Sequence, residues 1–238
     1  MDYFRPHLML LRISLMAFIF SFLFSKVFAQ EKSIRFDFGL LYKDQMIKMN
    51  KDYFFKSSND SFKITVLKFY ISNICFYDKD KLVWSEKNST HLVDVNAKGF
   101  FTVNMPNQLN IDKVSFDLGI DSVTNTSGAL DGDLDPMLGM YWTWQSGYIN
   151  LKLEGLYNYS DMQQQPFEFH IGGYNGEDNA LQHLYFDVNP GKNKLSYKFK
   201  LDSILNELKN INYKHLMSPG INAVLFSKMI GKNIILTQ

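Results

Sequence analysis

The side chains of this chain that could bind a metal ion or catalyse a reaction are few, because it has five His and one Cys among its 238 residues. A single Cys cannot form an internal disulfide, and it rules out metal sites made of several thiolates. Cys75 lies between Ile74 and Phe76, an apolar setting in which a buried, unreactive thiol is expected. A bound metal would therefore need His, Met, carboxylate or aromatic side chains around it.

The common catalytic motifs are absent from the sequence. It has no phosphate-binding glycine loop, no Gly-x-Ser-x-Gly turn and no His-Glu-x-x-His pair. Asp131, Asp133 and Asp135 have the spacing that begins a calcium loop, but the Gly at the sixth position and the distal Glu of an EF-hand are missing. We therefore favour a solvated acidic turn here, with calcium binding as the alternative. No enzymatic activity is expected.

The most distinctive segment is rich in Gly, Asp and aromatic residues, and a strand-like segment with a His follows it. The first runs from Asp121 to Trp144 and continues to Tyr148. The second, residues 167–173, reads Phe-Glu-Phe-His-Ile-Gly-Gly. Alternation along a strand would place His170 on the face opposite its apolar neighbours, so His170 need not lie in the core.

Strands must position these residues, because much of the chain alternates between apolar and polar side chains, with turn signals between the segments. This pattern predicts an all-β fold, a single antiparallel β-sandwich over residues 30–238. Two short helices are expected near the C-terminus, at Leu201–Lys209 and at Ile221–Ile230, the second with Ser218 as N-cap and Pro219 at its first position. The alternating segments are 34–38, 62–74, 114–118, 149–153, 167–171, 184–188 and 195–201.

Residues 1–29 are predicted to be a signal peptide. Arg5 and Arg12 precede an apolar run, 13–24, that is too short to span a membrane, and Ala29 suits a cleavage site. Cleavage would leave 22 basic and 23 acidic residues, a net charge of −1. We expect a periplasmic or secreted protein with no stable membrane insertion after cleavage and no nucleic-acid partner. An uncleaved anchor is the alternative.

Several segments, taken in order, resemble the MbnP-like family. They include Leu67–Ile74, the Met-Tyr-Trp-x-Trp-x-x-Gly-Tyr block at 140–148, and the Phe-x-Phe-His-x-Gly segment at 167–172. The resemblance extends from Ile34 to Ile230. The family comprises exported proteins related to the copper-binding partner of methanobactin systems and to surface copper proteins of methane-oxidising bacteria. It implies a β-sandwich that binds copper, serves metal acquisition or handling, and has no established enzymatic activity.

The resemblance also implies candidate site residues. In characterised relatives, two His and a Trp oxidised to kynurenine hold Cu(I). Carried over to this chain, His170 is the candidate imidazole ligand. Trp142 or Trp144 is the candidate for oxidation, which would require a Trp-oxidising partner enzyme.

One imidazole of the pair is missing from its usual place. Some relatives have a His two residues after the modified Trp, and this chain has Trp144 there. The second imidazole would then come from His215, from His183 or, less favourably, from His91. His215 has the further advantage that Met217 offers a thioether nearby in the sequence.

A different reading, without a metal, stays open. In it the aromatic block is packing, because aromatic side chains bury the most area, and His170 is a hydrogen-bonded residue of a strand. The protein would then be a periplasmic or surface interaction module.

Overall fold

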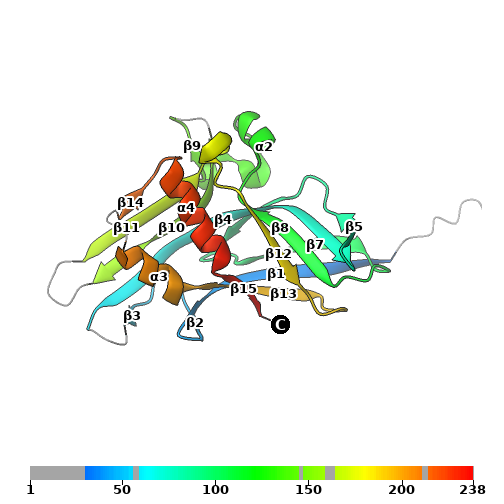
Figure 1. Cartoon of the computed structure of the whole chain (residues 1–238), viewed down its shortest axis with the longest axis horizontal. Coiled ribbons are helices and arrows are strands. Elements are labelled where there is room, and N and C mark those ends of the chain that lie inside the picture. Colours follow the sequence, from blue (N-terminus) through cyan, green and yellow to red (C-terminus); the bar gives the residue numbers. More distant parts are fainter. Residues whose placement is uncertain (1–29, 56–58, 145–146, 159–163, 211–213, 238) are drawn as a thin grey trace, which may run out of the picture.

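The alternating segments of the sequence form two facing sheets in the computed structural model (Figure 1), which describes residues 30–55, 59–144, 147–158, 164–210 and 214–237. The predicted signal peptide lies outside these residues and stays a prediction. The β-sandwich with short helices near the C-terminus is confirmed.

The first sheet has the strand order β15-β13-β1-β2, and β7 also pairs with β1. β1 and β13 run parallel, whereas the other pairs of this sheet are antiparallel. A parallel pair needs a long connection, and most of the second sheet lies between these two strands in the sequence. Alternation reveals a strand and its buried face, but it does not reveal this direction. The strands are β1 (Glu31–Tyr42), β2 (Gln45–Ile47), β7 (Phe100–Pro106), β13 (Lys194–Lys200) and β15 (Ile234–Thr237).

The second sheet has the order β12-β8-β4-β10-β11-β14, and four short strands pair with its central members. β4 is the longest strand and contacts β8, β10 and three of the short strands. β14 runs parallel to β11 at one edge. The strands are β3 (Tyr53–Phe54), β4 (Ser61–Asp78), β5 (Lys81–Ser85), β6 (Thr90–Asp94), β8 (Lys113–Leu118), β9 (Tyr141–Trp142), β10 (Gly147–Asn158), β11 (Gln165–Gly172), β12 (Gln182–Asp187) and β14 (His215–Leu216).

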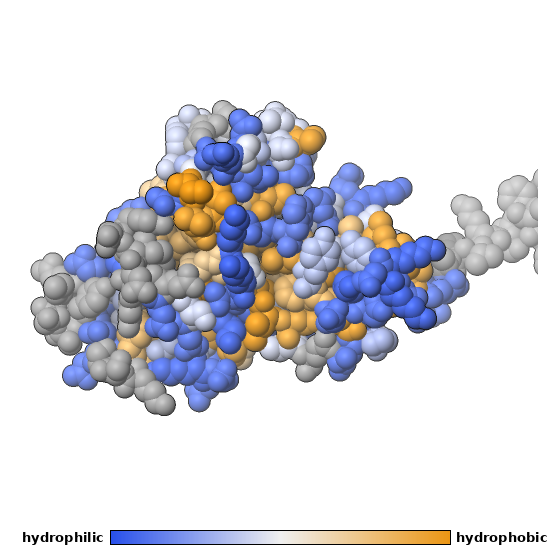
Figure 2. Space-filling view, viewed as in Figure 1, coloured by the Kyte–Doolittle hydropathy of each residue, from blue (hydrophilic) through white to orange (hydrophobic). Residues whose placement is uncertain are grey.

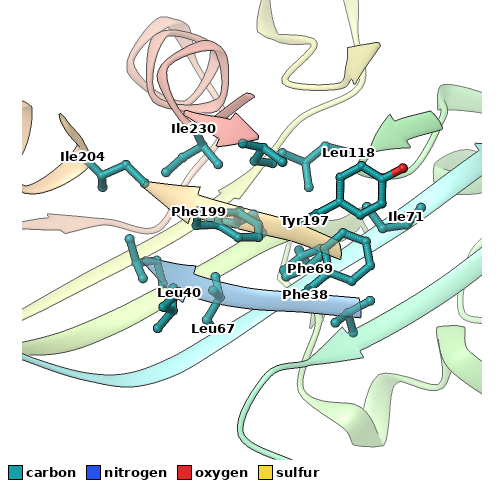
Figure 3. Close-up of a cluster of buried hydrophobic side chains, with 14 of the residues drawn as sticks. Phe38, Leu40, Leu67, Phe69, Ile71, Leu118, Tyr197, Phe199, Ile204 and Ile230 are labelled. Carbon is teal, nitrogen blue, oxygen red and sulfur yellow. The ribbon is translucent and has the colours of Figure 1, made fainter. Parts of the chain in front are cut away.

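The main core lies between the two sheets and is rich in aromatic side chains (Figure 3). Phe38 and Phe199 of the first sheet contact Phe69 of the second, with ring centroids 5.1 and 5.0 Å apart respectively. These three side chains are at most 6% exposed. Most of the aromatic content of the sequence is therefore explained by packing, whose burial drives folding.

Two helices near the C-terminus complete this core. α3 (Leu201–Asn210) buries Leu201, Ile204 and Leu205, and α4 (Ile221–Lys232) packs against β11 and β12. The prediction of Ser218 as the N-cap of α4 is wrong. Gly220 occupies that position with φ 136°, a conformation that disfavours residues with a side chain, so the helix starts only after it.

The face in Figure 2 carries many hydrophilic residues, with apolar residues visible between them. Near the start of α4, Ile221 and Leu225 are exposed. Among the residues that the structure describes, no helix is long and apolar enough to cross a membrane.

Candidate metal centre

His170 lies on the outer face of β11, as the alternation predicts. Its neighbours Phe169 and Ile171 are fully buried in the main core. The imidazole is 12% exposed, and its Nε2 atom is 2.8 Å from Oε1 of Glu154 on the adjacent strand β10. Burial lowers the pKa of His170, and the hydrogen bond to Glu154 opposes that change. A neutral imidazole, the form that binds metals, is therefore favoured.

His215 lies on the strand next to that of His170, because β14 adds to the edge of β11. The parallel register places Glu168 opposite His215 and Phe169 opposite Leu216. Leu216 packs against the core, so His215 faces outward on the same side as Glu168 and His170. Of the predicted second imidazoles, His215 is thus the one on a strand paired with that of His170, where it contacts Glu168 at 3.1 Å.

Trp142 packs against Gly172 of the same strand, two residues after His170. Its side chain is 5% exposed, and its Cζ3 atom would be 2.7 Å from a Cβ atom on Gly172. Gly172 and His170 face the same side of β11 because they are two residues apart. The absence of a side chain at Gly172 therefore makes room for the indole. Trp144 has its ring centroid 5.8 Å from that of Trp142 and is 65% exposed.

A second, smaller core supports Trp142 on the outer face of the second sheet. The segment from Asp121 to Tyr141 contributes α2 (Ser122–Thr126) and two short 3-10 helices, Gly132–Leu134 and Pro136–Leu138. Figure 1 shows α2 and β9 near each other at the top of the view. The buried residues of this second core are Tyr70, Ile120, Met140, Trp142, Tyr148 and Ile149.

Tyr148 holds this segment in place, a role that its position in the sequence did not suggest. Its hydroxyl accepts a hydrogen bond from the backbone N–H of Leu130 at 3.0 Å and lies 3.1 Å from the carbonyl of Leu134 and 3.2 Å from that of Gly128. Asn125 adds a link by accepting the N–H of Tyr148 at 2.8 Å. Three turns of irregular backbone thus converge on one phenol.

The substitution Tyr148→Phe is expected to destabilise the protein by about 1–3 kcal/mol, because it leaves several backbone groups without partners. Tyr70→Phe is the matched control in the same core. Among the described residues the Tyr70 hydroxyl is buried without a hydrogen-bond partner, so its removal is expected to be neutral or slightly stabilising. Urea unfolding of both variants measures the difference, and equal effects would contradict the role of Tyr148.

One lysine of β4 and one of β10 contact the backbone of the Asp121–Tyr141 segment. Nζ of Lys152 donates to the carbonyl of Gly139 at 2.7 Å, and Nζ of Lys68 lies 3.5 Å from that of Leu138. Burial lowers the pKa of Lys152, with nearby Glu154 opposing that change. The ammonium of Lys152 therefore contacts the segment above the sheet, although Lys152 is the cross-strand neighbour of His170.

The other two His of the described residues lie elsewhere. His183 lies on the far edge strand β12 and contacts Asp117 of β8. The strands β8, β4 and β10 separate it from β11, a distance of roughly 19 Å. His91 pairs with Glu86 at 2.8 Å and stacks on Phe101. The structure does not bring either imidazole to His170.

The acidic turn has structural contacts of its own. Asp133 accepts the backbone N–H of Leu92, and Asp135 accepts that of Met137 and caps the second 3-10 helix. Within the described ranges, no three His, Cys, Asp or Glu side chains gather where they could hold a metal ion. Calcium binding therefore has no support from the geometry of this turn, and the solvated turn stays the favoured reading.

Comparison with known proteins gives two matches. The sequence model of the MbnP family matches residues 31–221. The structure resembles that of MbnP from Methylosinus trichosporium with a TM-score of 0.56 and 13% sequence identity, over 74% of this chain and 78% of that one. At this identity the likeness shows the fold alone. None of the curated proteins compared with the chain matches it.

Proposed function

This chain belongs to the MbnP family, and from that membership we propose that it is an exported protein that binds copper as Cu(I) and serves metal acquisition or handling. The observation that supports this proposal is the position of His170 and His215 on one outward face of the paired strands β11 and β14. Export rests on the sequence of residues 1–29 alone.

The donor set fits a soft, low-coordinate ion better than a hard one. Imidazole suits copper, and a thioether selects Cu(I) over hard cations. Among the described residues, no three His, Cys, Asp or Glu side chains gather as a zinc or calcium site would require. In this proposal Cu(I) is the cargo that the protein passes between partners, and no reaction takes place on the ion. The protein itself would hold the imidazoles, exclude competing hard ions and release the metal.

Trp142 and Trp144 are the proposed positions of an oxidised Trp, by their resemblance to the relatives. They differ in access, because Trp144 is 65% exposed and Trp142 is 5% exposed. A Trp-oxidising partner enzyme could therefore reach Trp144 in the folded protein, whereas Trp142 would have to be modified before the segment closes over it. Intact-mass analysis of the native protein tests whether either Trp is modified.

Titration of residues 30–238 with Cu(I), in competition with a chromophoric chelator, tests the proposal. We expect one equivalent to bind, and His170→Ala to abolish stoichiometric binding because it removes the more buried imidazole. His183→Ala is the matched control, since it deletes an imidazole that also pairs with a carboxylate but lies across the sheet. Equal losses in both variants, or no binding by the unaltered protein, would rule out this site.

The second candidate function is an interaction module without a metal. The exposed apolar residues on α4, Ile221 and Leu225, favour it together with the neighbouring Met217. Contiguous exposed apolar surface is typical of protein–protein contacts. If the unaltered protein binds no Cu(I), the interaction module becomes the favoured function.

A further inference from the structure

β12 forms a free edge of the second sheet. Among the described strands it pairs with β8 alone, and no other backbone–backbone hydrogen bond within the described ranges reaches residues 182–187. Of the four strands that end the two sheet orders, β12 is the longest, with 6 residues against 4 in β15, 3 in β2 and 2 in β14. A free edge offers N–H and C=O groups that can pair with a strand of another molecule.

β12 lacks the features that usually protect such an edge. Its sequence, Gln-His-Leu-Tyr-Phe-Asp, has no Lys and no Pro, and its register with β8 runs without a bulge. The side chains that alternate inward are Gln182, Leu184 and Phe186, none of them charged. Leu184 and Phe186 are only partly buried against the main core, and Tyr185 in the middle of the outer face is 64% exposed. Both faces of the edge can therefore receive a second strand.

The sequence of β12 is complementary to itself in one antiparallel register. If a two-fold axis passes through Tyr185, His183 of each copy lies opposite Asp187 of the other. On the inner face, Leu184 of each copy then lies opposite Phe186 of the other, so that partly buried apolar side chains meet. Moving the axis by one residue in either direction places Tyr185 opposite His183 or Asp187 instead and loses the charge match.

The strand behind β12 extends this match. Within one chain, Asp117 of β8 lies opposite His183 and contacts its Nδ1 atom, and Lys113 of β8 lies opposite Asp187. Each half of the pairing would then be a row of alternating charge. The row runs from Lys113 and Asp187 of one copy to His183 and Asp117 of the other. As an imidazolium, His183 can donate one N–H to each of the two carboxylates beside it, and opposite charges directly across a strand pair stabilise it.

We propose that β12 is a docking edge for a second copy of this chain, and that two copies pair antiparallel about Tyr185, joining their second sheets into one. The strand pairing involves 6 residues from each copy, so the dimer is small and in reversible equilibrium with the monomer. His170 and His215 lie on β11 and β14, beyond β8, β4 and β10, so the pairing does not cover the candidate metal centre.

Disulfide cross-linking tests the register. In a Cys75→Ser background, Tyr185→Cys places two thiols opposite each other on the axis, within the Cα separation that a disulfide needs. In the neighbouring registers the same two Cα atoms would be roughly 8 Å apart, beyond that reach. Val123→Cys is the matched control for random collision, because Val123 is 74% exposed in α2. With oxidised glutathione, we expect Tyr185→Cys to form a covalent dimer about 10-fold faster or more than Val123→Cys.

Sedimentation velocity of the purified protein tests the equilibrium. We expect the unaltered protein to shift from monomer towards dimer between about 1 and 300 µM. Tyr185→Lys should weaken the dimer about 10-fold or more, because it places two ammonium groups opposite each other on the axis. Val123→Lys adds the same charge on α2 and should dimerise as the unaltered protein does. Urea midpoints in dilute solution show whether both variants are folded.

Three results would overturn the inference. A protein that stays monomeric at every concentration has no such dimer, and the edge would be left to a strand of a different protein. Equal cross-linking of Tyr185→Cys and Val123→Cys would show that the thiols meet only by collision. A dimer that Tyr185→Lys does not weaken would be held by another surface than β12.

Discussion

Replacing Gly155 with alanine is expected to destabilise the fold by about 3 kcal/mol or more. Gly155 lies in the middle of β10, between β4 and β11, where the register with β4 shifts. A Cβ atom there would collide with the backbone carbonyl of Lys63, and it would also overlap the ring of Phe167, whose Cε1 atom would be 2.7 Å away. The carbonyl belongs to the neighbouring strand and cannot move without breaking the ladder between the two strands.

Gly231→Ala is the matched control for Gly155→Ala. Gly231 lies in α4, where alanine is intrinsically favoured, and the nearest atom to its Cβ would be the flexible tip of Leu184 at 3.2 Å. We expect this variant to be neutral or slightly stabilised. Urea unfolding, followed by circular dichroism with a common slope, measures both. If the two variants unfold at the same urea concentration, the close approach at Gly155 does not constrain the fold.

The strands and their buried faces were predictable because a half-buried sheet leaves a repeat of two residues in the sequence. The prediction for residues 167–171 is confirmed residue by residue, with Phe167, Phe169 and Ile171 buried and His170 turned outward. Strand partners were not predictable in this way. The parallel pairings of β1 with β13 and of β11 with β14 join segments far apart in the sequence, and alternation is identical in parallel and antiparallel strands of this kind.

The candidate site shows the same limit. His170 and His215 were each identifiable as possible ligands, but only the parallel pairing of β11 with β14 puts them on adjacent strands. The contribution of Glu154 also depends on a register, that of β10 with β11. Tyr148 was part of a recognisable aromatic block, yet its contacts with three separate turns depend on how the Asp121–Tyr141 segment folds back. Local sequence identified the donor side chains, and long-range pairing decided which of them lie on adjacent strands.

The substitution Phe69→Ala is expected to destabilise the protein by about 3–5 kcal/mol, the usual cost of removing a fully buried aromatic ring. Phe69 belongs to the second sheet and packs between Phe38 and Phe199 of the first (Figure 3). Its loss removes a contact that joins the two sheets and leaves a cavity that rigid strands cannot fill. Phe54→Ala is the control, because the Phe54 side chain is 65% exposed and should contribute less than about 0.5 kcal/mol. Urea midpoints that do not differ between them would contradict this account of the core.

The same variant also tests whether the candidate metal centre is independent of the main core. Phe69 points into the space between the sheets, whereas His170 and His215 are on the opposite, outward side of the second sheet. Below the temperature at which Phe69→Ala unfolds, its Cu(I) affinity should therefore equal that of the unaltered protein. Gly172→Ala should show the opposite pattern, because a methyl group at that position displaces the ring of Trp142 from the face that carries His170. A loss of affinity in Phe69→Ala at a temperature where it is folded would show that the centre depends on the packing between the sheets.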